Sequence, residues 1–97
     1  MYWYRQVADQ GDASGQFNLG SLYILGRGVP QDYGQGLYWL QKSADQGDSW
    51  AEFDLGSLYE RGEGVTRDLA QALDWYRKAA AQGNQMARAA LQRLGSQ

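Results

Sequence analysis

The sequence carries few of the side chains that perform catalysis. It contains neither His nor Cys, so the usual general base, the thiol nucleophile and the commonest metal ligands are missing. None of its serines is followed three residues later by Lys, which excludes the nucleophile motif of penicillin-interacting enzymes. What remains for chemistry is a small set of carboxylate pairs and one glycine-rich segment.

The carboxylate pairs are Asp48 with Glu52 and Glu60 with Glu63. Catalytic carboxylates need burial or close pairing to shift their pKa values, whereas these pairs fall on surfaces that we expect to be solvated. The segment Gly26-Arg27-Gly28 lacks the third glycine and the preceding strand of a dinucleotide site. We therefore expect no enzymatic activity, no cofactor and no metal ion, and we assign no catalytic residue.

The composition indicates one small globular domain over residues 1–97, with 43% hydrophobic residues and a net charge of -2. Scattered Lys and Arg argue against a nucleic-acid partner, because phosphate binding depends on clustered basic residues. No apolar run approaches the roughly 20 residues that span a bilayer, and the start is not a signal peptide. We expect no membrane association and, with no Cys, a cytoplasmic protein.

A repeat of 36 residues organises the chain, since Trp3, Trp39 and Trp75 are equally spaced, as are Gly11, Gly47 and Gly83. About half of the positions are identical between the first two aligned units, far above chance. Such a repeat predicts supersecondary units that stack on their neighbours.

Each unit shows the pattern of two helices. The first, helix A, has apolar residues at helical spacing over 13–25, and Asp12, Asp48 and Asn84 precede it as N-caps. Glycines in segment 26–31 then end it in a tight turn. The second, helix B, opens with a capping box at Asp32 and Gln35 or at Asp68 and Gln71. It runs to about residue 46 or 82, and its expected buried positions are Leu37, Leu40 and Ala44, then Leu73, Tyr76 and Ala80, with the recurring Trp residues beside them.

Four glycines carry separate expectations. Gly20 and Gly56 recur inside helix A at a cost of roughly 1 kcal/mol each relative to Ala, which suggests close helix packing. Gly34 and Gly36 instead align with Ala70 and Ala72, so replacing either by Ala is expected to stabilise a regular helix.

These patterns predict an all-α fold, an α-α superhelix (solenoid) of antiparallel helix pairs with about six helices. We divide the chain into a partial helix B over 2–10, repeats at 11–46 and 47–82, and a final helix A over 84–95. The aromatic start offers no polar cap, so this end is expected to be covered by another chain or by further sequence.

The unit resembles the Sel1-like repeat, in its Leu55-Gly56-Ser57-Leu58-Tyr59 piece, its Gly62-Glu63-Gly64-Val65 turn and its Trp75-to-Ala80 segment. The period separates it from tetratricopeptide units of about 34 residues. The resemblance implies a right-handed superhelix whose A helices line a concave face, with roles in assembling complexes, in signalling and in host-cell interaction in bacteria. Some secreted relatives carry disulfides and are associated with penicillin-like compounds, and the lack of Cys sets this chain apart from them.

A partner, protein or peptide, is expected on the face of helix A opposite Leu19 and Tyr23, where side chains vary between units. Trp50 is either an aromatic anchor for the partner or a cover over the junction between units. A self-assembling unit that forms homo-oligomers through its terminal helices is the alternative function, followed by a binder of peptidoglycan or β-lactam compounds. The predicted partner-binding residues are Asn18, Ser21, Leu25, Trp50, Asp54, Ser57, Arg61 and Met86.

Overall fold

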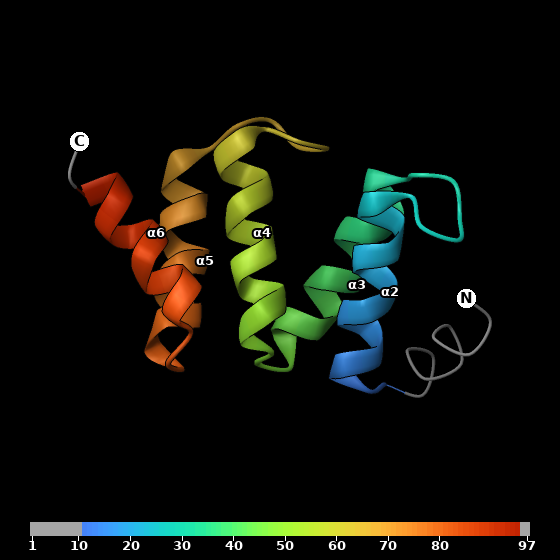
Figure 1. The fold of residues 1–97 in the computed structure, drawn as a ribbon, viewed down its shortest axis with the longest axis horizontal. Helices are drawn as coiled ribbons and strands as arrows, with labels where there is room; N and C mark the ends of the chain where they lie inside the picture. Colours follow the sequence, from blue (N-terminus) through green and yellow to red (C-terminus); the bar gives the residue numbers. More distant parts are fainter. Residues whose placement is uncertain (1–10, 96–97) are drawn as a thin grey trace.

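The computed structural model describes residues 11–95, and these form α-helices without any strand. The helices are α2 (Ala13–Leu25), α3 (Tyr33–Asp45), α4 (Ser49–Arg61), α5 (Leu69–Ala81) and α6 (Gln85–Gly95). They follow one another along a single array (Figure 1). The all-α repeat fold is confirmed, while the helix expected over 2–10 lies outside the described residues.

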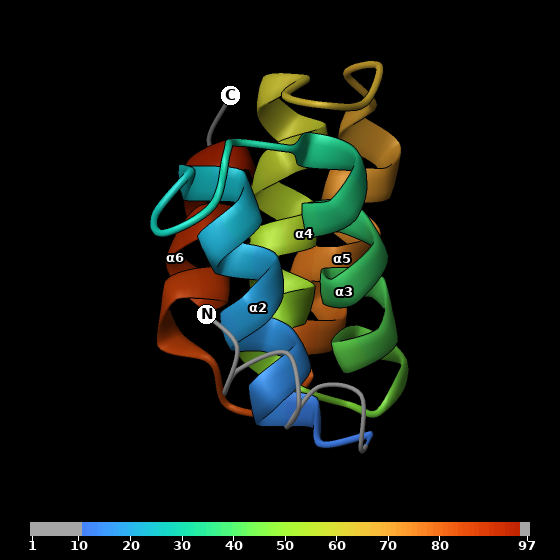
Figure 2. The ribbon, with the colours of Figure 1, turned by 90° about the vertical axis from the view of Figure 1, so that its right-hand side faces the viewer.

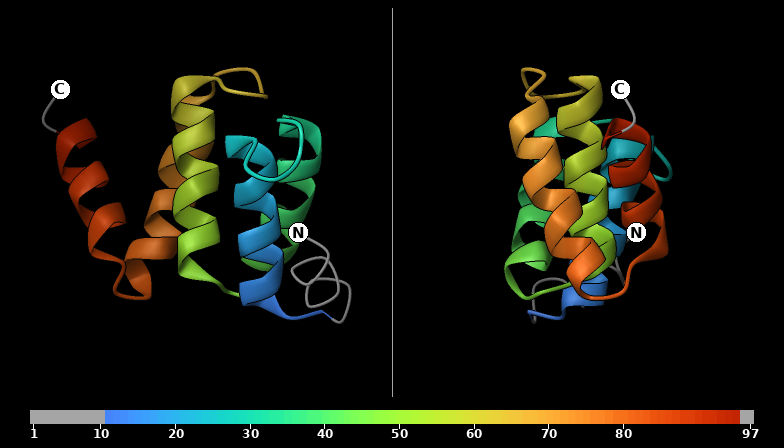
Figure 3. Two further views of the ribbon diagram at one scale, coloured as in Figure 1. Left: turned by 45° about the vertical axis from the view of Figure 1, so that its right-hand side comes forward. Right: turned by 90° about the vertical axis from the view of Figure 1, so that its left-hand side faces the viewer.

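The helices form antiparallel pairs that stack side by side. α2 packs most extensively on α3, and α4 on α5, whereas the contacts from one pair to the next are fewer. Viewed along the array, α2 and α6 lie on one side and α3 and α5 on the other (Figure 2), and the right-hand view of Figure 3 agrees. The A helices and the B helices therefore form separate layers.

Each A helix begins at its predicted cap. A side-chain oxygen of Asp12 accepts a hydrogen bond from the Gly15 backbone N–H at 2.8 Å. The Asp48 carboxylate accepts from Trp50 at 3.0 Å and from Ala51 at 3.1 Å, and Asn84 accepts from Ala87 at 3.0 Å. These bonds satisfy donors that the first helical turn leaves free.

The B helices begin at Asp32 and Asp68, whose side chains accept from the backbone N–H three residues on, both at 3.1 Å. A capping box also predicts that the Gln side-chain oxygen accepts a hydrogen bond from the backbone N–H of the Asp cap, and this part of the prediction is wrong. That N–H donates instead to the carbonyl of Tyr23 at 2.9 Å in one pair and of Tyr59 at 3.0 Å in the next. The end of helix A thus already satisfies the donor, and the bond also ties the two helices together.

The core follows the predicted stripe on helix B. Leu40, Ala44 and Tyr76 are buried, whereas Leu37, Leu73 and Ala80 are partly exposed. Trp39 is buried against Leu19, as expected. Trp75 is only partly buried, with the Lys78 ammonium 4.5 Å from its ring centroid, and Trp3 lies outside the described residues.

The two mid-helix glycines lie where helix A approaches helix B most closely. A Cβ atom on Gly20 would lie 2.9 Å from Leu40 Cγ and 3.0 Å from the carbonyl oxygen of Gly36. A Cβ atom on Gly56 would lie 2.8 Å from Tyr76 Cδ1 and 3.2 Å from the carbonyl oxygen of Ala72. Real Cβ contacts are rarely this short, so the close packing predicted from these glycines is confirmed.

Gly34→Ala should raise the melting temperature, corresponding to some tenths up to about 1 kcal/mol. The nearest neighbour of a new Cβ would be Asp32 Oδ1 at 3.3 Å, and Ala70 occupies the equivalent place beside an Asp cap with the same 3.1 Å bond. Thermal unfolding followed by circular dichroism measures the change, and a lower melting temperature would contradict it.

Gly36→Ala is the matched comparison, and here the structure corrects the expectation from sequence. The backbone is helical, but a Cβ atom would overlap the side chain of Ile24 and lie 3.1 Å from the carbonyl oxygen of Gly20. Overpacking of this kind typically costs about 1–3 kcal/mol. This variant should therefore melt at a lower temperature than the unmodified protein. A higher melting temperature would contradict this and show that α2 moves aside at little cost to accommodate the new Cβ atom.

Candidate functional site

The layer of A helices carries hollows in the gaps between successive A helices. The first, the α2–α4 groove, has a volume of about 260 Å³, and the second, the α4–α6 groove, about 370 Å³. The first is lined by Ser21, Ile24, Leu25, Leu40, Asp54, Ser57, Leu58 and Arg61. The second is lined by Phe53, Ser57, Glu60, Arg61, Tyr76, Met86, Ala89, Ala90 and Arg93.

Most of the residues predicted to bind a partner meet in these grooves. Ser21, Leu25, Asp54, Ser57 and Arg61 all line the α2–α4 groove. Ser57 and Arg61 also line the α4–α6 groove, together with Met86.

Two of the predicted residues lie outside both linings. Asn18 and Trp50 are exposed on the A helices. The Trp50 ring meets the Phe53 ring edge-on at a centroid distance of 6.2 Å while half of the residue, 50%, stays exposed. Trp50 thus covers a neighbouring aromatic and also keeps a free surface.

The two grooves are the same place in successive units of the 36-residue repeat. Ile24 in the first corresponds to Glu60 in the second, and Leu40 corresponds to Tyr76. Ser57 of the first groove likewise corresponds to Arg93 of the second, and Asp54 corresponds to Ala90. The two grooves thus share the same helical framework, but the side chains that line them differ in chemistry.

In the α4–α6 groove the variable residues bond to one another. Arg93 donates through both terminal nitrogens to the Glu60 carboxylate, at 2.8 and 2.9 Å, and the Tyr76 hydroxyl donates to the same carboxylate at 2.7 Å. The bonds from Arg93 lower the pKa of the Glu60 carboxyl, and burial raises the pKa of the Tyr76 hydroxyl. We call this arrangement the Glu60 clasp, and its charges are already paired.

In the α2–α4 groove the equivalent positions, Ile24, Leu40 and Ser57, form no such clasp. Its floor is apolar, and the half-buried Asp54 carboxylate is held by no hydrogen bond or ion pair from the residues that the structure describes. Burial raises the pKa of the Asp54 carboxyl from 3.8 to about 6, against the opposing attraction of Arg61. This groove therefore combines an apolar floor with an unpaired acidic group.

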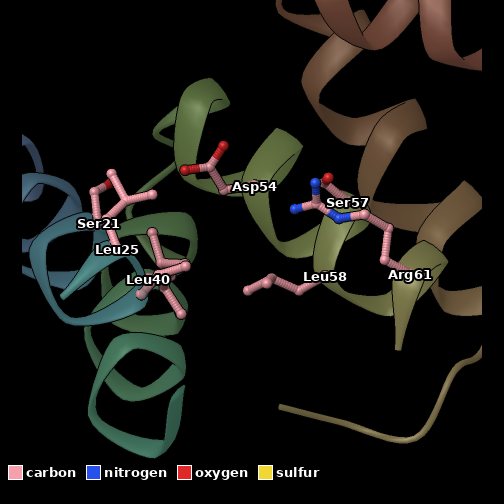
Figure 4. Close-up of a pocket in the computed structure, with 8 residues that line it drawn as sticks. Ser21, Leu25, Leu40, Asp54, Ser57, Leu58 and Arg61 are labelled. Atoms are coloured by element: carbon pink, nitrogen blue, oxygen red, sulfur yellow. The ribbon is translucent and has the colours of Figure 1, made fainter. Parts of the chain in front are cut away.

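Arg61 is the other charged residue of the α2–α4 groove. It lies seven residues beyond Asp54, which is about 10 Å along a helix, and Figure 4 shows the two side chains at separate places along α4. The Nε atom of Arg61 lies 3.5 Å from a Glu63 carboxylate oxygen, and 56% of the Arg61 side chain is exposed. The guanidinium therefore has both a protein partner and contact with water.

Sequence reasoning missed the floor of the α2–α4 groove. Ile24 and Leu58 were assigned no role in binding, and Leu40 was assigned to the core alone. The signal available in the sequence was the change from Ile24 to Glu60 and from Leu40 to Tyr76 between otherwise similar units, which marks positions that the frame leaves free to vary.

Other kinds of site find little support between residues 11 and 95. No group of three or more acidic, His or Cys side chains in this range is placed to hold a metal ion. None of the helices in the same range is both long enough and apolar enough to cross a membrane.

Comparison with known proteins gives a consistent result. The Sel1 repeat model matches residues 1–12, 13–48 and 51–84. A Sel1 repeat protein from Oxalobacter formigenes has a similar structure, with a TM-score of 0.85 and 36% identity over 93% of this chain and 68% of that one. A protective antigen of uropathogenic Escherichia coli strains, described as having an SLR fold, has a TM-score of 0.83 and 43% identity over 86% of this chain. This chain spans 18% of the length of that antigen, and no curated protein sequence matches it.

Asp54→Asn should stabilise the protein at pH 7, by up to about 3 kcal/mol if the whole pKa shift is recovered. Because the pKa of this acid is higher in the folded state, the unmodified protein loses stability as the pH rises from about 4 to about 6 and no further above that. The difference in stability between Asp54→Asn and the unmodified protein should therefore become small near pH 4.

Chemical denaturation at several pH values tests this expectation, with Asp45→Asn on α3 as a control at an exposed carboxylate. An Asp54→Asn variant that is no more stable than the unmodified protein at pH 7 would show that the carboxylate is well solvated or paired.

Proposed function

Because the chain belongs to the Sel1 repeat family, whose members generally act as protein-interaction scaffolds, we propose that it binds a peptide segment of another protein through its A-helix face. The α2–α4 groove is the observation that carries the proposal. It offers apolar contact at Ile24 and Leu25, above the buried Leu40 and Leu58, together with a few polar groups at its edges, the usual composition of a recognition site. Asn18, Trp50 and Met86 extend the proposed surface along the same layer of helices.

Binding is a better account of the groove than catalysis. A raised pKa such as that of Asp54 also occurs in catalytic acids, so the neighbouring groups decide. The other titratable residue in the lining is Arg61, which stays protonated in proteins and is no proton acceptor. The two lining hydroxyls, Ser21 and Ser57, have no base among the described residues to activate them, since neither forms a hydrogen bond with Asp54. Hydrolysis of a peptidoglycan or β-lactam compound therefore has little support.

End-to-end self-assembly is also less well supported. Helix α3 packs against Gly20 of α2, and helix α5 packs against Gly56 of α4. The equivalent residue of α6 is Gln92, which is exposed and carries a polar side chain where α2 and α4 have none. The exposed side of α6 thus resembles the polar cap of a repeat array more than a docking surface for another copy.

The proposal is tested with peptides selected from a random dodecapeptide display library and then synthesised for calorimetric titration. The matched variant copies the second groove into the first, by Ile24→Glu, Leu40→Tyr and Ser57→Arg together. Because the chain already accommodates these residues one repeat later, the variant should fold, while the apolar floor is replaced by a paired clasp. Peptide affinity should fall by at least about tenfold, which equals 1.4 kcal/mol.

Circular dichroism and thermal unfolding establish that the triple variant is folded. Tyr38→Ala, at a residue exposed on α3 in the opposite layer, should bind as the unmodified protein does. Unchanged affinity in the folded triple variant, or a library that yields no binding peptide, would overturn the proposed function.

A further inference from the structure

The α2–α4 groove has an electrostatic requirement that none of the described residues meets. A carboxylate that is moved away from water needs a donor or a cation in exchange. The other shielded carboxylates of α4 have one, since the buried Glu52 accepts from Gln82 at 2.7 Å and the half-buried Glu60 accepts from Arg93 and Tyr76. Between residues 11 and 95, Asp54 has no such partner.

The α4–α6 groove shows how this surface holds a cation. Arg93 projects from α6 and reaches Glu60 on the neighbouring A helix, where its guanidinium binds the carboxylate through two nitrogens. The position equivalent to Arg93 in the α2–α4 groove is Ser57. The short side chain leaves open the space that an arginine occupies one repeat later.

From these two observations we infer that the α2–α4 groove receives a Lys or Arg side chain of the bound partner. The methylene groups of that side chain lie on Ile24 and Leu25, above the buried Leu40 and Leu58, and its cationic group pairs with Asp54. Long basic side chains commonly bury an apolar stem in this way while the charged head finds a polar partner. The inference rests on the proposed function and specifies the chemistry of the partner.

An acidic partner at Arg61 is the competing possibility, and the contacts favour the basic one. Arg61 is more than half exposed and lies 3.5 Å from Glu63, so an additional anion would gain little there and would meet Asp54 within the same groove. A basic side chain instead pairs a group that has no partner. Guanidinium and carboxylate also match geometrically through paired hydrogen bonds, which makes Arg the better of the two basic residues.

The pairing should depend on pH. The groups that line the groove with Asp54 are uncharged on α2 (Ser21, Ile24 and Leu25) and on α3 (Leu40). The charges that act on it are Arg61 at the end of α4 and Asp48, the N-cap before α4. Since burial raises the pKa of the Asp54 carboxyl to about 6, this group gains a proton between pH 7 and pH 5. Affinity for a basic peptide should fall over the same interval.

The experiment uses four pools of acetylated hexapeptide amides that differ at one fixed central residue, which is Arg, Lys, citrulline or Glu. The flanking positions are mixed from Ala, Leu, Ser and Gly, and binding to the unmodified protein is measured by fluorescence anisotropy at pH 7 and pH 5. The Arg and Lys pools should bind at least about tenfold more tightly than the citrulline pool at pH 7. At pH 5 this preference should shrink.

Asp54→Asn should abolish the preference for Arg over citrulline at both pH values, whereas the control Asp45→Asn should keep it. If the citrulline and Arg pools bind equally and the triple groove variant binds neither, the inference fails while the proposed function stands. A preference for the Glu pool that disappears in Arg61→Gln would also overturn the inference. If no pool binds and the display library yields no peptide, the proposed function fails as well.

Discussion

The structure depends on how closely helix A can approach helix B within each pair. At Gly20 and Gly56 the backbone of one helix lies against the backbone and side chains of the other, at distances that leave no room for a Cβ atom. This close approach makes each pair a firm unit. Since the contacts between successive pairs are fewer, the space between A helices is not filled, and the grooves follow from that imbalance.

Polar bonds hold the two helices of the α2–α3 pair together at the end where helix A begins. The Ser43 hydroxyl donates to the carbonyl of Ala13 at 2.7 Å, and the side chain of Gln46 donates to that of Gln16 at 2.8 Å. Both bonds join the end of α3 to the beginning of α2, within one pair. At the other end, α4 and α6 are held together by the Glu60 clasp, whereas α2 and α4 are separated by a groove with an apolar floor. Figure 3 shows that α5 and α6 converge at the end where the chain connects them.

The sequence predicted the fold because the repeat and the caps are local signals, each legible within one unit. The outward residues of helix A also followed from helical spacing, which is why Ser21, Asp54 and Arg61 were found. The features that were missed depend on distances between helices. The hydrogen bond from Asp32 to Tyr23, the crowding of Gly36 by Ile24 and the partial exposure of Trp75 all arise from tertiary packing.

The unpaired state of Asp54 is itself an argument about its role. A residue retained for stability at this position would resemble Ala90, which is buried in the second groove without any electrostatic cost. A carboxylate instead destabilises the folded chain at neutral pH, and groups of that kind concentrate at functional sites. The frame tolerates it because the close contact at Gly56 and the Glu52 hydrogen bond involve other side chains of α4, which face α5 and its C-terminal cap. The repeat thus separates the residues that hold the helices together from the one whose charge, in our proposal, is left for a partner.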